Sequence, residues 1–200
     1  MTRMSLAEVN SLESKQFEWV FKNVVEHHEA AARWVHNERP FQTVPDLCAA
    51  FHKYLDDIPV EEKLLILKLH PDLAGRLAAQ GELTAESTRE QQSAGLDNLT
   101  KEQKAIIETS NERYKTKFGF PFIICARENK VQAIIEGLQK RHINTKEEEI
   151  EIGINELNTM LQYKLLHDSV WLSRHLTELR CVENIFKTNV EVSPREHIML

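Results

Sequence analysis

The sequence predicts an all-α fold, built as a single-domain helical bundle. Glycine and proline are scarce, with six of each in 200 residues, so few positions interrupt a helix. Between them, apolar residues recur at intervals of three and four, which places them along one face of an amphipathic helix. A chain of this length can bury one substantial core. We therefore expect one helical domain over residues 1–180 and a tail over residues 181–200, where the periodicity has faded.

Three helices are expected in the N-terminal part of the chain. The first begins near Leu12 and ends before Pro40, because the Arg39-Pro40 pair favours an extended step. The apolar face of this helix carries Phe17, Val20, Phe21, Val24, Val25 and His28. Two shorter helices are expected over residues 44–55 and 60–69.

Another three helices are expected in the C-terminal part. The first, over residues 98–117, should stop at residues 118–122, because the glycine and proline of this segment are poorly accommodated inside a helix. The apolar run over residues 122–126 is expected to be buried. Helices over residues 129–141 and 146–179 complete the bundle.

Composition argues against several classes of protein. Lys and Arg number 25 against 31 Asp and Glu, and the net charge of −6 disfavours a nucleic-acid binder that depends on general attraction to phosphate. A small anionic substrate remains compatible with a local site. Cys48, Cys125 and Cys181 are odd in number and widely spaced, which favours reduced thiols in an intracellular compartment. The N-terminus does not resemble a secretory signal, and no apolar run reaches membrane-spanning length, so we expect a soluble protein.

His70 and Glu90 form the strongest chemical signal, and they lie on either side of a loop over residues 80–84. An imidazole titrates near neutral pH and a carboxylate can orient it, so the pair suits general acid/base chemistry. Pro71 disfavours a helical backbone at His70, so we expect the imidazole at a helix end, facing a cleft. The alternative interpretation is that His70 packs against or caps a neighbouring helix.

Ser87 and Glu90 also have the spacing of a capping box. In that motif the serine oxygen accepts a hydrogen bond from a helix amide, and the glutamate accepts one from the serine amide. Both roles are compatible, because a helix N-terminus offers amide donors and a field that favours an anion. Gln91 would add two amide donors and one acceptor.

Other polar clusters carry weaker signals. His27 and His28 are adjacent, so they project from different sides of a helix, and no His-x-x-x-His or Cys-x-x-Cys pair completes a tetrahedral site. We therefore expect no metal. The acidic run over residues 147–149 is interpreted as a solvated helix beginning. Phosphate-binding loops, nucleophile elbows and cysteines in a nucleophile context are all missing from the sequence. A cofactor-free proton-transfer enzyme is the catalytic class that remains.

Three motifs together resemble the 2-oxo-4-hydroxy-4-carboxy-5-ureidoimidazoline (OHCU) decarboxylase family of urate breakdown. They are His70-Pro71-Asp72-Leu73-Ala74-Gly75, Ser87-x-x-Glu90-Gln91-x-x-Ala94-Gly95-Leu96 and Asn111-x-x-Tyr114-x-x-Lys117-Phe118-Gly119-Phe120-Pro121-Phe122. The similarity extends upstream through Arg39-Pro40-Phe41 and downstream to about Leu166. Three motifs in matching order and spacing are more specific than any one of them.

This resemblance implies an all-helical, homodimeric enzyme that converts the ureidoimidazoline to (S)-allantoin without a metal or organic cofactor. Electrons released with carbon dioxide move into the neighbouring C=N bond, so the substrate is its own electron sink. The protein must orient the carboxylate, help the hydroxyl become a carbonyl, and deliver one proton to one face. We expect a cytoplasmic or peroxisomal location, although Ile198-Met199-Leu200 does not form a clear peroxisomal signal.

The resemblance also implies roles for individual residues. His70 would exchange a proton with the hydroxyl or the ring, while Glu90 would orient His70 or take part in the transfer. Ser87 and Gln91 correspond to positions that hold the ureido and ring amides, and Pro71 shapes the wall beside His70.

A further part of the implied binding site is the segment over residues 118–124, which resembles a pocket strand whose backbone bonds the substrate ring. Phe120, Ile123 and Ile124 are therefore expected to contact substrate. The alternative is that Phe120 and Pro121 serve only as core and turn residues.

Two departures from the family pattern stand near its end. Lys164-Leu165 occupies the place of an Arg-Leu pair, and lysine keeps the charge but lacks the planar fork of arginine. Lys164 is expected to bind substrate; the alternatives are weaker activity, a shifted register, or substitution by Arg174. The second departure is an extension after His167, whose Val170-Trp171-Leu172 cluster could extend the dimer interface or cover the site.

An active decarboxylase is the leading hypothesis. The second is a non-catalytic relative that binds a ureido ligand or acts as a helical interaction protein, and it draws on Lys164 and the extension. The third is a purely structural helical module, in which His70 packs and Ser87 caps a helix.

Overall fold

The computed structural model describes residues 4–167, and within them the chain is helical without any β-strand. This confirms the predicted all-α class. The helices are α1 (Leu6–Ser11), α2 (Ser14–Phe21), α3 (Glu29–His36), α4 (Val44–Asp57), α5 (Val60–Leu69), α6 (Arg76–Gln80), α7 (Ala85–Ala94), α8 (Lys101–Phe118), α9 (Val131–Arg141) and α10 (Lys146–Gln162), and a π-helical turn (Tyr163–His167) follows.

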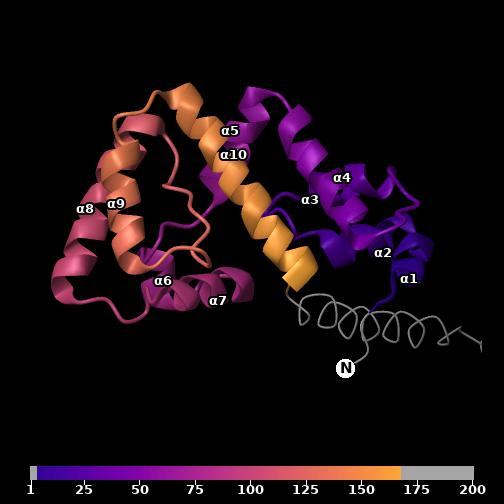
Figure 1. Ribbon diagram of the computed structural model, residues 1–200, viewed down its shortest axis with the longest axis horizontal. Coiled ribbons are helices and arrows are strands. Elements are labelled where there is room, and N and C mark those ends of the chain that lie inside the picture. Colours follow the sequence, from indigo (N-terminus) through magenta and orange to yellow (C-terminus); the bar gives the residue numbers. More distant parts are fainter. Residues whose placement is uncertain (1–3, 168–200) are drawn as a thin grey trace, which may run out of the picture.

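Helix α10 is the central element of the bundle. It crosses the middle of the molecule, with α1–α4 on one side and α6–α9 on the other (Figure 1), and it packs against both α4 and α5. At Gly153 a Cβ atom would lie 2.8 Å from Cδ2 of the buried Leu67 on α5. Glycine therefore allows α10 and α5 to approach closely at the centre of the molecule.

Aromatic side chains fill the core on both sides of α10. On the N-terminal side, the rings of Phe17 and Phe21 lie 4.4 Å apart, and Phe51 lies 6.1 Å from Phe21. On the other side, Tyr114 lies 4.5 Å from the ring of Phe118 and 5.2 Å from that of Phe122. Ring pairs at these separations stabilise a fold by about 0.5–1.5 kcal/mol beyond the area they bury.

The expected single helix from Leu12 to Pro40 is wrong. Helix α2 ends at Phe21, an irregular segment follows over residues 22–28, and α3 begins at Glu29. His27, just before α3, has a φ of +58°, a left-handed conformation through which a right-handed helix cannot continue. Val24 and Val25 of this segment are nonetheless buried. Their apolar side chains therefore reflect the packing of an irregular segment against the core and do not mark the face of a helix.

Four of the other expected helices are confirmed as α4, α5, α8 and α9, with boundaries shifted by a few residues. The helix expected over residues 146–179 is observed as α10 and the π-helical turn. Residues beyond 167 lie outside the described part of the chain, and so do Arg174, Cys181, the cluster over residues 170–172 and the tail over residues 181–200.

The acidic run at the start of α10 is solvated only in part. Glu147 and Glu148 are exposed, and Glu148 completes a capping box with Thr145. Glu149 is fully buried and accepts hydrogen bonds from Tyr114, Asn144 and Arg141, which corrects the solvated interpretation at that position. The reason is its position on the face of α10 that turns toward α8 and α9.

Two further expectations concern buried residues. Residues 122–126 are buried as expected, and Cys48 and Cys125 are buried free thiols.

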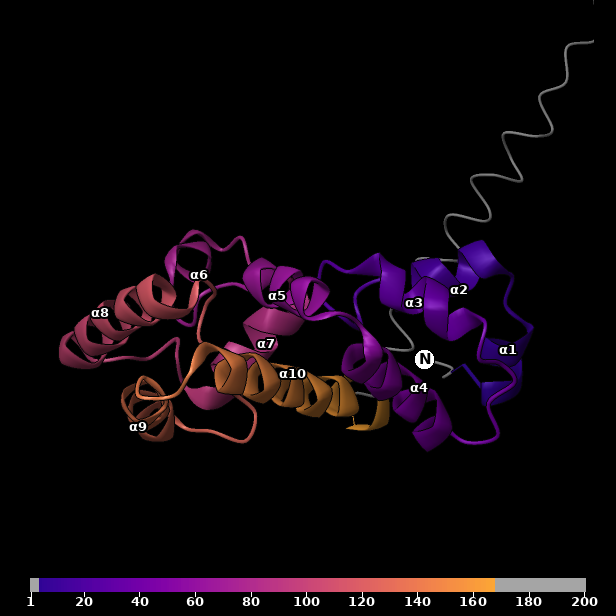
Figure 2. The ribbon, with the colours of Figure 1, turned by 90° about the horizontal axis from the view of Figure 1, so that it is seen from above.

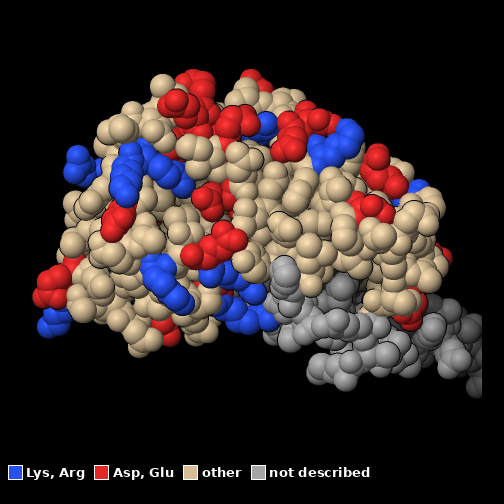
Figure 3. Space-filling model, in the orientation of Figure 1, with Lys and Arg blue, Asp and Glu red and all other residues tan. Residues whose placement is uncertain are grey.

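None of the described helices is long and apolar enough to span a membrane. On the face shown in Figure 3, acidic and basic side chains are interspersed over the surface.

Candidate active site

His70 lies at the C-terminal end of α5, as the sequence predicts. Its backbone is extended, with φ −69° and ψ 141°, and Pro71 follows it, so the helix ends there. The imidazole turns inward, and its side chain is only 9% exposed. The position combines a helix end with near-complete burial, so the imidazole is removed from bulk water.

Helix α7 presents three of the expected site residues on one face. Ser87, Glu90 and Gln91 are spaced at i, i+3 and i+4, so their side chains point the same way. Ser87 is not the helix cap, and the predicted capping box is therefore wrong. Thr84 takes that position, because its hydroxyl accepts the Ser87 N–H at 3.1 Å. The Ser87 hydroxyl is thus directed into the site.

A second carboxylate, Glu26, lies beside His70 and was not singled out from the sequence for this role. Its Oε2 is 3.7 Å from Nδ1 of His70. The hydroxyl of Ser87 donates to both of its oxygens at 2.9 Å, and the Thr84 hydroxyl donates to Oε1. The one sequence signal is that Glu26 follows Val24 and Val25 directly, a charged residue at the end of an apolar pair.

These side chains enclose a small cavity. Its lining residues come from the segment over residues 22–28, the end of α5, α7, the segment over residues 122–126 and the end of α10; they are Glu26, His70, Pro71, Leu73, Ser87, Glu90, Gln91, Ile124, Ala126, Met160 and Lys164. The volume of about 30 Å³ is close to that of a single water molecule.

A larger cavity of about 420 Å³ adjoins this one and shares His70 and Pro71 with it. Lys68, Arg76 and Lys115 are among the residues that line it. The wall formed by His70 and Pro71 thus separates the small cavity from a space of substrate size with basic side chains.

The segment over residues 118–124 contributes less to the cavity than expected. Ile124 lines it, whereas Phe120 lies in the core, 6.0 Å from Tyr114 and 6.2 Å from Phe118 between ring centres. Phe120 also borders the larger neighbouring cavity. Ile123 is buried outside the lining, and its carbonyl accepts a hydrogen bond from Arg141 at 2.8 Å.

Burial determines the charge state of His70. It lowers the pKa of the imidazole to about 4, although the carboxylate of Glu26 acts in the opposite direction. His70 is therefore neutral near pH 7. Nδ1 faces the Glu26 carboxylate, and Nε2 is buried without a hydrogen-bond partner among the described residues. A proton on Nδ1, toward Glu26, leaves the lone pair of Nε2 as an available base.

The two carboxylates differ in their affinity for a proton. Burial acts to raise the pKa of Glu26, but its electrostatic interaction with the imidazole of His70, the charge of Lys164 and two hydroxyl donors outweigh burial, and the net shift is downward. Burial raises the pKa of Glu90, and neither the charge of Lys164 nor the N–H of Ala126 offsets it. Glu26 is thus held as an anion, while Glu90 takes up a proton more readily.

Lys164 lies in the site, at the position expected from sequence spacing. It is 8% exposed, and its ammonium donates to the carbonyls of Asn23 at 3.3 Å and Val24 at 3.2 Å. The π-helical turn after α10 carries it there. Its charge acts on Glu26, His70 and Glu90.

The lowered pKa of His70 predicts a specific loss of stability in acid. The unfolded chain has an ordinary histidine pKa of about 6.5, so between pH 6.5 and 4 the unfolded state binds a proton that the folded state does not. Stability from this group is present above pH 6.5 and is lost as the pH falls toward 4. Urea unfolding over this range should show the wild type losing up to about 3 kcal/mol more than His70→Gln. Parallel curves for the two proteins would contradict the buried neutral imidazole.

Comparison with known proteins places this arrangement in a family. The OHCU decarboxylase family matches residues 10–165. The 2-oxo-4-hydroxy-4-carboxy-5-ureidoimidazoline decarboxylase of Amia calva is 40% identical over 162 residues, which cover 81% of this chain and 93% of that protein.

Two solved structures share the fold. The crystal structure of (S)-allantoin synthase superposes with a TM-score of 0.66 at 20% identity and covers 82% of this chain and 53% of that one. The crystal structure of OHCU decarboxylase in the presence of (S)-allantoin gives a TM-score of 0.61 at 20% identity, covering 77% and 96%. Because the family match spans most of the chain, this protein belongs to the OHCU decarboxylase family.

Proposed function

We propose that this protein decarboxylates 2-oxo-4-hydroxy-4-carboxy-5-ureidoimidazoline to (S)-allantoin in urate degradation, in the cytoplasm or the peroxisome. The observation that carries the proposal is a buried, neutral His70 whose Nε2 lacks a partner among the described residues, beside two carboxylates with opposite pKa shifts. Relatives that carry this activity in their names match over most of the chain.

In this mechanism the acid and base roles fall to different residues. As the C–COO⁻ bond breaks, its electrons move into the adjacent C=N bond and carbon dioxide leaves. Nε2 of His70 accepts the hydroxyl proton as the hydroxyl becomes a carbonyl and passes it to the nitrogen of the former C=N bond, which has received the released electrons, while Glu26 holds the imidazole. The raised pKa of Glu90 supports this residue as the donor of the proton to the ring carbon. Delivery from one side of the pocket would give a single enantiomer.

Binding would use the remaining polar side chains of the pocket. The carbonyl oxygen of Gln91 accepts the N–H of Ala74 at 2.9 Å, which leaves its amide N–H groups to donate to a ureido or ring carbonyl. Lys164 supplies a positive charge for the substrate carboxylate. The hydroxyl of Ser87 donates to Glu26, and Ser87 lines the same cavity as Gln91 and Lys164. Pro71 and Ile124 form apolar walls of this cavity.

We expect His70→Gln and Glu90→Gln each to reduce the decarboxylation rate by about two to four orders of magnitude, the usual effect of losing an acid/base group. The rate is followed as optically active allantoin by circular dichroism. Glu82→Gln, the same change at an exposed position, is the matched control. Wild-type rates in a folded His70 or Glu90 variant would exclude the assigned roles.

The charge of Lys164 is expected to matter more than its shape. Lys164→Gln should lower kcat/KM by about 10- to 100-fold, because the substrate carboxylate then no longer faces a buried positive charge. Lys164→Arg should stay within about tenfold of the wild type. Lys146→Gln, on the exposed start of α10, controls for the charge change alone. Unchanged kinetics in Lys164→Gln would remove Lys164 from the binding site.

We also propose that the protein forms a homodimer through the outer face of α5. Helix α5 buries Ile66 and Leu67, yet Leu65 and Leu69, which lie one turn apart on another side of the helix, are exposed by 53% and 39%. In Figure 2 this helix lies along the upper edge of the molecule. A helix with apolar residues on both faces is typical of one covered on both sides.

A single charge on this face tests the dimer. Leu65→Asp should shift the mass measured by light scattering from two chains to one, because an interface cannot bury an unpaired carboxylate. Glu61→Asp, at an exposed position of the same helix, should leave the mass unchanged. A dimeric Leu65→Asp protein would place the interface elsewhere.

A further inference from the structure

The segment over residues 122–126 forms one wall of the active-site cavity, and within residues 4–167 no strand lies beside its backbone. Buried backbone groups need hydrogen-bond partners, and side chains supply three of them in this segment. The Ile123 carbonyl accepts from Arg141 at 2.8 Å, and the Cys125 N–H donates to Oε2 of Glu156 at 2.7 Å. The next amide, of Ala126, donates to Oε1 of Glu90 at 3.1 Å.

These two consecutive amides connect the active site to a carboxylate outside it. The Cys125 N–H belongs to the peptide that joins residues 124 and 125, and the Ala126 N–H belongs to the next peptide. Glu156 on α10 is the acceptor for the first, and Glu90 on α7 is the acceptor for the second. The hydrogen bond to Glu156 therefore fixes the planar peptide that directly precedes the one bound to Glu90.

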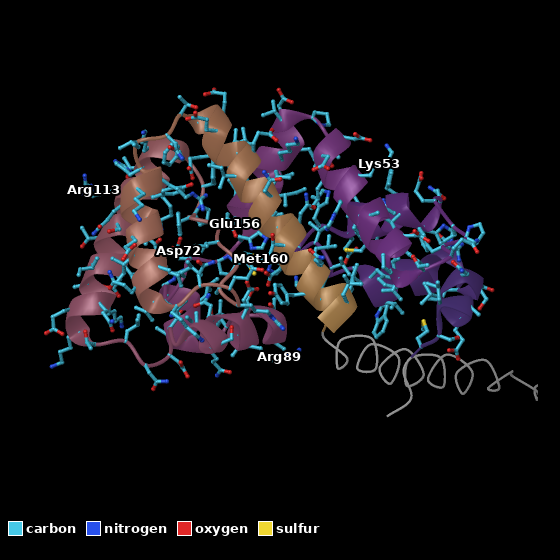
Figure 4. All side chains as sticks on the ribbon, viewed as in Figure 1. Lys53, Asp72, Arg89, Arg113, Glu156 and Met160 are labelled. Carbon is cyan, nitrogen blue, oxygen red and sulfur yellow. The ribbon has the colours of Figure 1, made fainter. Side chains whose placement is uncertain are left out.

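Glu156 is itself held in place. It projects from the central part of α10 (Figure 4), and its Oε1 lies 4.0 Å from a guanidinium nitrogen of Arg141. Arg141 is anchored in turn by the buried Glu149 at 2.8 Å and lies over the ring of Phe122 at 4.5 Å. These contacts connect the core to the segment over residues 122–126 without involving the cavity. Glu156 is not among the residues that line the cavity.

We infer that Glu156 is a positioning residue for the decarboxylation, acting on Glu90 through the backbone of Cys125, which joins the peptide bound to Glu156 to the peptide bound to Glu90. The inference rests on the proposed function, since Glu90 has a catalytic role only in that reaction. Glu156 does not touch the reacting atoms. It fixes the direction of the hydrogen bond that orients the Glu90 carboxyl, and a displacement of about 1 Å at such a group costs about a hundredfold in rate.

Three substitutions at Glu156 separate the effects of side-chain length, charge and hydrogen bonding. Glu156→Gln keeps an acceptor oxygen at the same reach and should keep kcat within about threefold of the wild type. Glu156→Leu removes the acceptor, and Glu156→Asp keeps the charge but shortens the side chain. Both should lower kcat by about 10- to 100-fold while KM changes less than threefold. Asn155→Leu, at the exposed neighbouring position, should match the wild type. Thermal melting confirms that each variant is folded, and Glu156→Asp serves if Glu156→Leu does not fold.

The Glu90→Gln background distinguishes positioning from a general structural effect. If Glu156 acts through Glu90, adding Glu156→Leu or Glu156→Asp to Glu90→Gln should lower kcat by less than threefold further. A full second loss in this background would overturn the inference, and so would wild-type kcat in the single Leu and Asp variants. The rate of (S)-allantoin formation by the wild type is measured first, because its failure removes the proposed function, whereas an active wild type isolates the role of Glu156.

Discussion

The active site depends on keeping one ionised carboxylate, that of Glu26, inside the protein. A buried anion is costly unless it is paired and hydrogen-bonded, and Glu26 meets this need with His70, Lys164 and the hydroxyls of Thr84 and Ser87. To bring its side chain there, the chain leaves the helical path after α2 and turns at His27. The break between α2 and α3 and the cap of α7 both follow from this requirement.

Burial then gives the remaining groups distinct chemistry. The same desolvation lowers the pKa of His70 and raises that of Glu90, so a neutral base and a carboxyl with increased proton affinity stand in one small cavity. In the proposed reaction, the C=N bond of the substrate accepts the electrons released with carbon dioxide. The protein then needs to supply little more than these two groups and a positive charge, here that of Lys164. The cavity of about 30 Å³ shares His70 and Pro71 with the cavity of about 420 Å³, whose volume suits a small ligand.

The sequence was informative wherever local chemistry decides the structure. Pro71 ends α5 at His70, and the apolar run at 122–126 is buried, both as predicted. The sequence was least informative where the partner is distant along the chain. Glu26 meets Ser87 from 61 positions away, and Glu149 is buried because α8 and α9 bring Tyr114 and Arg141 to it. Thr84, not Ser87, caps α7, because both residues carry a hydroxyl within the same turn and spacing alone does not rank them.

The most direct test of this account is the chirality of the product. Urate oxidase and hydroxyisourate hydrolase would generate the unstable substrate in the presence of this protein, while circular dichroism follows allantoin as it forms. The account predicts rapid formation of (S)-allantoin, because one buried donor delivers the proton to one face. Racemic allantoin at the spontaneous rate would contradict it and favour a non-catalytic relative that binds a ureido ligand or a protein partner.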